Sequence, residues 1–245
     1  MKITIVGYWG GFPGVNEATS GYLLQSGSFN LLLDCGSAVL SQLQNYLPAD
    51  QLNAVILSHY HHDHVADVGP LQFARLISSY LHADHTVLPI YGHQFDIEAF
   101  NKLTYKEVTE GCSYSPEKTL NIGPFTISFL KTLHPVDCFA MRITDKKSTV
   151  VFTADSAFQQ SFIPFTLGAD LLLSECNLYG NQDGEKSGHM TSYQAAKIAE
   201  ETGVKELILT HLPHFGDHQD LVKEAQTIYK GKITLAHTGY VWKKS

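Results

Sequence analysis

A dense group of side chains that can bind metal ions follows the apolar run 54–57. The segment reads Ser58-His59-Tyr60-His61-His62-Asp63-His64, with the pattern HxHxDH. The spacing of His59 and His61 sends both side chains to one side of an extended segment, while Asp63 and His64 begin the turn into the next element. Imidazole and carboxylate groups at this density can serve two metal ions and suit Zn²⁺, Mn²⁺ or Fe²⁺. The cluster therefore predicts a metal centre rather than a solvated histidine loop.

Three later β-type runs each lead into one further residue of ligand type. Run 129–133 leads into His134, run 150–154 into Asp155, and run 207–210 into His211. Taken singly, either histidine reads more readily as a loop residue, and Asp155 as a turn former or a helix cap. Residues that follow the strands of α/β sheets gather outside the carboxyl ends of those strands. Together with the first motif, the pattern predicts one shared crevice.

Strands interleaved with helices predict an α/β protein. The strand runs are 3–7, 21–24, 30–33, 54–57, 125–130, 148–152, 171–173, 206–209 and 233–235. A helix is predicted over 191–202, with Thr191 or Ser192 as its cap and Gly203 as its stop. A second helical pattern, 71–81, carries apolar residues on two faces and predicts substantial burial. No linker composition interrupts the chain, so one domain over residues 1–245 is expected.

Composition and charge indicate the class of protein, its location and the kind of substrate that it can bind. With 245 residues, 44% of them apolar and 17% charged, the chain has the composition of a soluble globular protein. No apolar run reaches about 18 residues and the start has no signal-peptide pattern, so a cytoplasmic protein without a membrane partner is expected. The four scattered cysteines should be reduced thiols. A net charge of −7 gives no electrostatic footprint for long nucleic acid and favours a small substrate.

These motifs together resemble a known family, the metallo-β-lactamase fold hydrolases, and within it the ribonuclease Z-like branch. The resemblance runs nearly end to end. It rests on the motifs 58–64, 133–135 (LHP), 153–156 (TADS), 210–214 (THLPH), the glycine-rich start 7–13 with 17–20, and the pair 174–176 (SEC) and 188–191 (GHMT). It implies a four-layer αββα sandwich with two metal ions at one edge.

The resemblance also implies how the ligands divide between the ions. His59, His61 and His134 would hold one ion, and Asp63, His64 and His211 the other, with Asp155 bridging both. The ligand types favour two divalent ions, Zn²⁺ first and Mn²⁺ or Fe²⁺ as alternatives, without any cysteine. The glycines at 7, 10 and 11 are expected to let backbone approach the loops of this centre.

Catalytic roles follow for three residues. Two cations that share a water lower its pKa to about 7 and stabilise the charge that develops in a displacement at phosphorus. Asp63 would orient the attacking water through its second carboxylate oxygen. His189 would protonate the departing alkoxide as the general acid, and Glu175 would orient and charge that imidazole. Without the resemblance, His189 reads as an exposed loop residue and Glu175 as a strand-end carboxylate in a salt bridge.

The first choice of function is a phosphodiesterase acting on a small or short substrate, such as a cyclic nucleotide, a dinucleotide or an oligonucleotide end. A ribonuclease Z-type endonuclease for transfer RNA 3′ ends ranks second. Enzymes of that kind usually carry a long arm between the motifs represented here by His134 and Asp155. Only 20 residues separate those two positions, enough for a hairpin over 139–152, and the negative charge offers little to bind a long RNA.

Other functions remain open from the sequence. Lactone and thioester hydrolases share the fold, and fold alone does not choose among them; His189 favours a diester because a good acyl leaving group has less need of an acid. A noncatalytic metal-binding protein is disfavoured by the full ligand set. A homodimer is also considered, with 72–80 or 82–91 as its interface. The remaining histidines are assigned to packing or surface positions, namely His62, His82, His85, His93, His214, His218 and His237.

Overall fold

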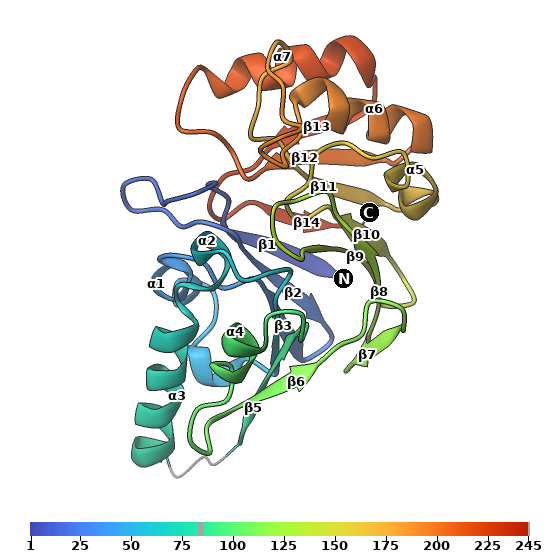
Figure 1. Ribbon diagram of the computed structural model, residues 1–245. Helices are drawn as coiled ribbons and strands as arrows, with labels where there is room; N and C mark the ends of the chain where they lie inside the picture. The colour runs from blue at the N-terminus through green and yellow to red at the C-terminus, as the bar shows by residue number, and fades with distance from the viewer. Residues whose placement is uncertain (83–85, 245) are drawn as a thin grey trace. The chain divides into compact units, whose positions relative to one another are not determined.

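A computed structural model describes residues 1–82 and 86–244 of the chain (Figure 1). Within these residues the chain forms two compact units, Met1–Ser115 with Thr238–Lys243, and Pro116–His237 with residue 244. Each unit contains one seven-stranded sheet. The single domain expected over residues 1–245 stays a prediction.

The sheet of the first unit has the order β14-β1-β2-β3-β4-β5-β6. Its strands are β1 (Lys2–Gly7), β2 (Gly21–Ser26), β3 (Phe29–Leu33), β4 (Ala54–Ile56), β5 (Leu88–Gly92), β6 (Thr109–Ser113) and β14 (Val241–Lys243). Strands β3 to β6 run parallel, and Leu33 of β3 pairs with Ile56 of β4. The residues that follow these two strands therefore emerge side by side, which places Asp34 next to Ser58.

Helices and strands of the first unit share one apolar core. The helices are α1 (Val39–Leu43), η1 (Ala49–Gln51), α2 (His62–Val65), α3 (Val68–His82) and α4 (Ile97–Asn101). Leu32, Val55 and Ile90 from the strands pack in one cluster with Leu43, Leu71 and Phe100 from the helices. Burial of this cluster fixes the ends of β3 and β4, from which the ligand-bearing segment departs.

Helix α3 departs from the burial expected of it. Leu71 is buried, but the inward face also carries Arg75, which donates hydrogen bonds to the carbonyl oxygens of Asp50 and Thr86. On the outward side, more than half of the surface of four large apolar residues is exposed, namely Phe73, Ile77, Tyr80 and Leu81. The prediction of substantial burial is therefore wrong for one face. Of the other candidate interface, 82–91, residues 83–85 lie outside the described part of the chain.

The sheet of the second unit has the order β13-β12-β11-β10-β9-β8-β7. Its strands are β7 (Leu120–Ile122), β8 (Phe125–Lys131), β9 (Phe139–Thr144), β10 (Thr149–Phe152), β11 (Leu171–Glu175), β12 (Glu206–Thr210) and β13 (Lys232–Leu235). Strands β9 and β10 form the hairpin predicted over 139–152. Strands β10 to β13 run parallel, and Glu175 pairs with Thr210. The segments that follow β10, β11 and β12 therefore leave the same edge of this sheet.

Three helices accompany the second sheet: α5 (Phe162–Thr166), α6 (Ser192–Thr202) and α7 (His218–Ile228). Helix α6 packs on β11 and β12, and α7 packs on α6 and β13 (Figure 1). Thr191 caps α6 in a reciprocal capping box with Gln194, and Gly203 ends the helix at φ 62°. The predicted helix is confirmed, with Thr191 rather than Ser192 as its cap. The cap also fixes the start of α6 three residues after His189.

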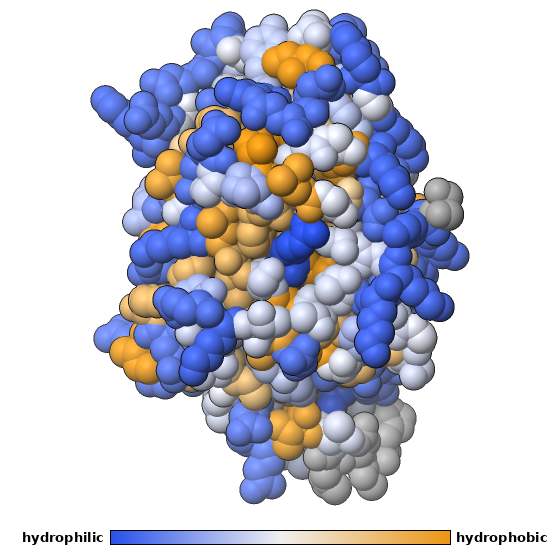
Figure 2. All heavy atoms as spheres, turned by 90° about the vertical axis from the view of Figure 1, so that its right-hand side faces the viewer, coloured by the Kyte–Doolittle hydropathy of each residue, from blue (hydrophilic) through white to orange (hydrophobic). Residues whose placement is uncertain are grey.

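Among the described residues, no helix has the length and apolar character needed to cross a bilayer. On the face drawn in Figure 2, hydrophilic side chains are interspersed with smaller apolar patches. Such a mixture is ordinary for the surface of a globular protein.

Candidate metal centre

The predicted ligands of the first unit lie between β4 and α3. The side chains of His59 and His64 are fully buried, and their ring centroids are 4.1 Å apart. The Nε2 atom of His59 lies 3.1 Å from Nδ1 of His61, and Nε2 of His64 lies 3.6 Å from Oδ2 of Asp63. The HxHxDH segment thus brings four groups of ligand type together.

Asp34 supports this cluster from behind and was missed in the sequence. It is fully buried, and its Oδ2 lies 2.7 Å from Nδ1 of His64. The same oxygen accepts hydrogen bonds from the hydroxyls of Ser20 and Ser58, each at 3.0 Å, and Oδ1 accepts the Ser58 N–H at 2.8 Å. An ionised carboxylate only accepts, so Nδ1 of His64 carries a proton and Nε2 keeps the lone pair that a metal needs. The sequence signal that could have identified Asp34 is its position directly after the predicted strand run 30–33.

The N-terminal loop of the first unit contacts Asp63 through its backbone. The Gly11 N–H donates to Oδ2 of Asp63 at 2.8 Å. Gly11 has a φ of 75°, a region that glycine enters without steric cost. Glu17 secures the same loop by accepting hydrogen bonds from the Tyr8 hydroxyl and the Trp9 indole. This is the close backbone approach that the glycine-rich start predicts.

The predicted ligands of the second unit also lie together, and their side chains are almost fully buried. Oδ2 of Asp155 lies 3.3 Å from Nε2 of His211 and 3.9 Å from Nε2 of His134. Nδ1 of His134 lies 3.1 Å from the carbonyl oxygen of Gly188. A carbonyl only accepts, so Nδ1 of His134 is protonated and Nε2 is the nitrogen available to a metal.

The geometry within each unit fits divalent ions. Ligand atoms that surround one ion at about 2.1 Å lie roughly 3.0–3.5 Å from one another. Two of the separations above, 3.1 and 3.3 Å, fall within this range, and the other two, 3.6 and 3.9 Å, lie slightly beyond it. The 3.6 Å pair of Asp63 and His64 and the 3.9 Å pair of His134 and Asp155 exceed hydrogen-bond length. The donor atoms thus converge as a coordination shell requires. The division of the seven residues between two ions stays a prediction.

Glu175 and His189, which only the resemblance had linked, are in contact. Oε1 of Glu175 lies 3.0 Å from Nδ1 of His189 and also accepts the Ser156 N–H at 3.0 Å. Glu175 is almost completely buried at the end of β11. The His189 ring centroid is 5.4 Å from that of His134, edge to face, and 5.4 Å from that of His211, nearly parallel. His189 therefore stands beside two predicted metal ligands with its Nδ1 held by a carboxylate.

Several other histidines have contacts of a structural kind, as assigned. His93 is buried and its ring packs on Tyr60. Nε2 of His218 lies 2.6 Å from the Pro213 carbonyl oxygen, and Nδ1 of His237 lies 3.3 Å from the Leu235 carbonyl oxygen. His85 lies outside the described residues.

All four cysteines are free thiols. Burial raises the pKa of Cys35 and Cys176 well above the ordinary value, and neighbouring carboxylates raise it further. Only a thiolate binds a metal or attacks as a nucleophile, so both side chains are held in their inert form. This agrees with a centre built from imidazoles and carboxylates.

Comparison with known proteins gives the family. The family described as "Beta-lactamase superfamily domain" matches residues 29–212. The chain is 61% identical over 242 residues to "Probable metallo-hydrolase YhfI" of Bacillus subtilis (strain 168), covering 99% of each chain. The crystal structure of that metallo-beta-lactamase fold protein matches with a TM-score of 0.97 over 98% of both chains.

Two more distant matches are informative. A ribonuclease Z of Brevibacillus brevis is 27% identical over 305 residues, covering 94% of this chain and 92% of its own. A diphosphatase from the PhnP family matches with a TM-score of 0.78 at 15% identity over 100% of this chain and 98% of its own, which shows shared fold alone. The predicted fold class and the likeness to the ribonuclease Z branch are confirmed. The chain therefore belongs to the β-lactamase superfamily and is a metallo-hydrolase with the metallo-β-lactamase fold.

Proposed function

We propose that the chain is a phosphodiesterase that acts on small or short nucleotide-type substrates. The observation that carries the proposal is the position of His189, whose Nδ1 is 3.0 Å from Glu175 and whose ring adjoins those of His134 and His211. An alkoxide that leaves phosphorus needs a proton, and an imidazole near the metal ligands is suited to supply it. A carboxylate beside an imidazole favours the protonated ring, which is the form that a general acid requires.

Two divalent ions, with Zn²⁺ favoured, would complete the centre. We expect His59, His61 and His134 to hold one ion, Asp63, His64 and His211 to hold the other, and Asp155 to bridge them. When bound, such ions lower the pKa of a water and stabilise the charge on the phosphoryl oxygens. The proposal rests on the family, on the donor types and on the convergence of these atoms within each unit.

Residues of the chain orient the attacking water and protonate the leaving group. Asp63, held by the Gly11 N–H, accepts a hydrogen bond from the attacking water and orients it. The water oxygen bonds to phosphorus and gives up one proton to solvent, while the bond from phosphorus to the leaving oxygen breaks. The leaving oxygen takes the proton from Nε2 of His189, because Nδ1 is engaged with Glu175.

A small substrate is favoured over transfer RNA. The β9–β10 hairpin takes up the interval between His134 and Asp155, where an RNA-clamping arm would be inserted. The chain's net charge of −7 works against a long polyanion. Processing of transfer RNA 3′ ends is the second candidate because a relative of 27% identity is named ribonuclease Z. A cytoplasmic location remains part of the proposal.

The dependence of rate on leaving group tests the role of His189. We expect His189→Ala to lose about 10²- to 10⁴-fold in kcat on a diester with an alkyl leaving group, and far less on a p-nitrophenyl diester, whose leaving group is stable without a proton. His237→Ala, which removes an exposed histidine of the same unit, serves as the matched control. An equal loss on both diesters would remove the general-acid role.

A further inference from the structure

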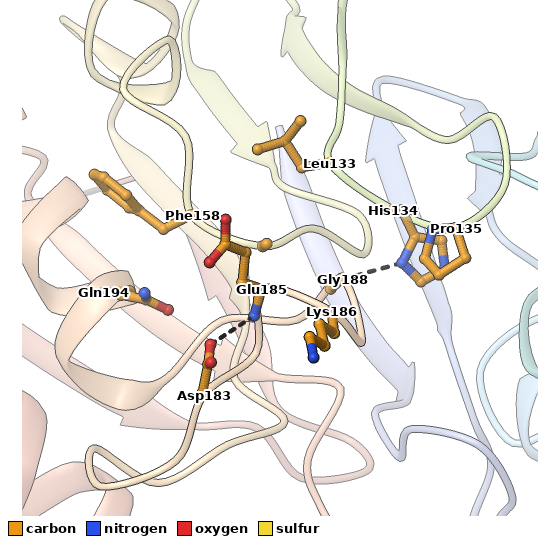
Figure 3. Close-up of a pocket in the computed structure, with 10 residues that line it drawn as sticks. Leu133, His134, Pro135, Phe158, Asp183, Glu185, Lys186, Gly188 and Gln194 are labelled. Atoms are coloured by element: carbon orange, nitrogen blue, oxygen red, sulfur yellow. Dashed lines mark hydrogen bonds between the residues drawn. The ribbon is translucent and has the colours of Figure 1, made fainter.

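The second unit contains a cavity of about 620 Å³ beside His134 (Figure 3). We call it the loop pocket; its lining includes Leu133, His134, Phe158, Glu185, Gly188 and Gln194. Its volume lies within the range of small-molecule sites, roughly 300–1,000 Å³. The pocket is therefore large enough to take a nucleoside-sized group.

One wall of the loop pocket is apolar. Leu133 is 52% exposed although it is a large apolar residue. Phe158 contributes an aromatic ring, over which the Lys197 ammonium lies 5.0 Å from the centroid. That contact holds the ring in place on one side. An aromatic ring with an aliphatic neighbour is suited to bind a flat heterocycle by stacking.

The polar side of the loop pocket is mainly acidic. Asp183 and Glu185 both line it, against one cation, Lys186. The Glu185 N–H donates to Oδ1 of Asp183 at 3.0 Å, which fixes this part of the loop. In Figure 3 the Glu185 carboxylate points to the side on which Phe158 and Leu133 lie, and the Lys186 ammonium points away from it. A carboxylate accepts hydrogen bonds from N–H groups and repels phosphate, so this pocket suits a base and not a second phosphate.

The floor of the loop pocket adjoins a predicted metal ligand. The Gly188 carbonyl oxygen lies 3.1 Å from Nδ1 of His134. A Cβ atom at Gly188 would lie 2.8 Å from that nitrogen and 2.8 Å from Cδ of Pro135, so no larger residue fits there without a shift. A group that fills the pocket therefore lies directly beside His134.

We propose that the loop pocket binds the nucleobase of the substrate, stacked on Phe158, with the Glu185 carboxylate accepting a hydrogen bond from an exocyclic amino group. Bases that carry an amino group, such as cytosine, are then preferred to uracil. This inference rests on the proposed phosphodiesterase function and specifies its substrate class.

The test compares the p-nitrophenyl esters of cytidine 5′-monophosphate and uridine 5′-monophosphate, whose bases differ at C4, an amino group against a carbonyl, and at N3, a lone pair against an N–H. One hydrogen bond to a charged group should favour the cytidine ester about tenfold in kcat/KM. Glu185→Ala should bring this ratio close to one, mainly by raising KM, and Glu185→Gln, which keeps an acceptor oxygen, should retain part of it. Phe158→Leu should raise KM for both esters. Glu200→Ala removes an exposed carboxylate outside the pocket and should keep the ratio.

Binding of the free nucleosides, measured by NMR titration, separates the pocket from the reaction. We expect cytidine to bind more tightly than uridine and to lose this advantage in Glu185→Ala. Diester cleavage without base preference, or with a preference that Glu185→Ala preserves, would overturn the pocket assignment and leave the proposed function standing. Cytidine binding that depends on Glu185 in a protein that cleaves no diester would support the pocket and overturn the function.

Discussion

Replacing Asp34 by asparagine should weaken metal binding while leaving the fold in place. Asparagine has the same shape, and its oxygen can still accept the Ser58 N–H that Oδ1 now accepts at 2.8 Å. Its NH₂ group then faces Nδ1 of His64, where a carboxylate oxygen lies at 2.7 Å in the native protein, and the hydroxyls of Ser20 and Ser58, which can rotate to accept hydrogen bonds instead of donating them. Nδ1 must become an acceptor, the ring proton moves to Nε2, and the lone pair that binds metal is lost.

The expected magnitude follows from that change of tautomer. Loss of a hydrogen-bonded partner behind a metal-binding histidine costs about 10- to 100-fold in metal affinity, equivalent to about 1.4–2.7 kcal/mol. Asp34→Ala should behave differently, because it leaves the buried donors of His64, Ser20 and Ser58 without an acceptor, at about 1–3 kcal/mol each. Asp34→Asn should therefore lower the affinity for metal, whereas Asp34→Ala should lower the stability of the fold.

The assay is zinc competition against a chromophoric chelator, with metal-stripped protein at constant pH. Circular dichroism of the same metal-free samples checks the fold. Asp50→Asn, the same substitution at an exposed position, is the control and should bind as the native chain does. Native affinity in Asp34→Asn would refute the proposal that Asp34 selects the tautomer of His64.

Four further outcomes are expected. Removal of metal by a chelator should lower the unfolding temperature, since ligand present at 1,000 times its Kd contributes about 4 kcal/mol; an unchanged temperature in scanning calorimetry would argue against bound metal. Gly11→Ala should cost about 1–2 kcal/mol because its φ is 75° and should lower kcat by displacing the N–H that holds Asp63, as denaturant titration and kinetics would show. At pH 8 a disulfide reagent should label the half-buried Cys112 before the buried Cys35 and Cys176, because it can reach that thiol; burial raises the pKa of all three thiols, and most strongly that of Cys35 and Cys176, so labelling of these two should speed up only at higher pH. If the exposed apolar residues of α3, Phe73, Ile77, Tyr80 and Leu81, form the interface of a homodimer, Ile77→Asp should convert the dimer to a monomer in light scattering. An unchanged mass would place the interface elsewhere.

Local sequence patterns predicted which strands end in residues of ligand type. They could not predict contacts between segments that are distant in the sequence. His211 follows β12 directly and was predicted from the four-residue run 207–210. Glu175 and His189 are 14 positions apart, and their contact depends on how β11 and the cap of α6 are placed, which only the resemblance supplied. Asp34 was missed although it follows a strand as His211 does, because its partner His64 lies 30 positions away.

Strands β5 and β6 were not predicted from the sequence, and each omission has a physical reason. Strand β5 contains Pro89, which argues against a strand, and β6 lies at an edge of its sheet, with Glu110 and Gly111 at its centre. Strand β5 pairs in parallel with β4 on one side and with β6 on the other, and this pairing stabilises β5 and β6. Such pairing between distant segments is not visible in a local sequence pattern. The exposed face of α3 shows the reverse error, since apolar residues on two faces were taken as evidence of burial.

The most direct test of the account is turnover of bis(p-nitrophenyl) phosphate beside a panel of lactones and thioesters, by protein of quantified metal content. Asp63→Ala is the control, because this residue is both a predicted ligand and the predicted orienting group for water. The account predicts metal-dependent cleavage of the diester alone, abolished in Asp63→Ala. Cleavage of the acyl substrates alone would contradict it and make the chain an acyl hydrolase in which His189 serves another purpose.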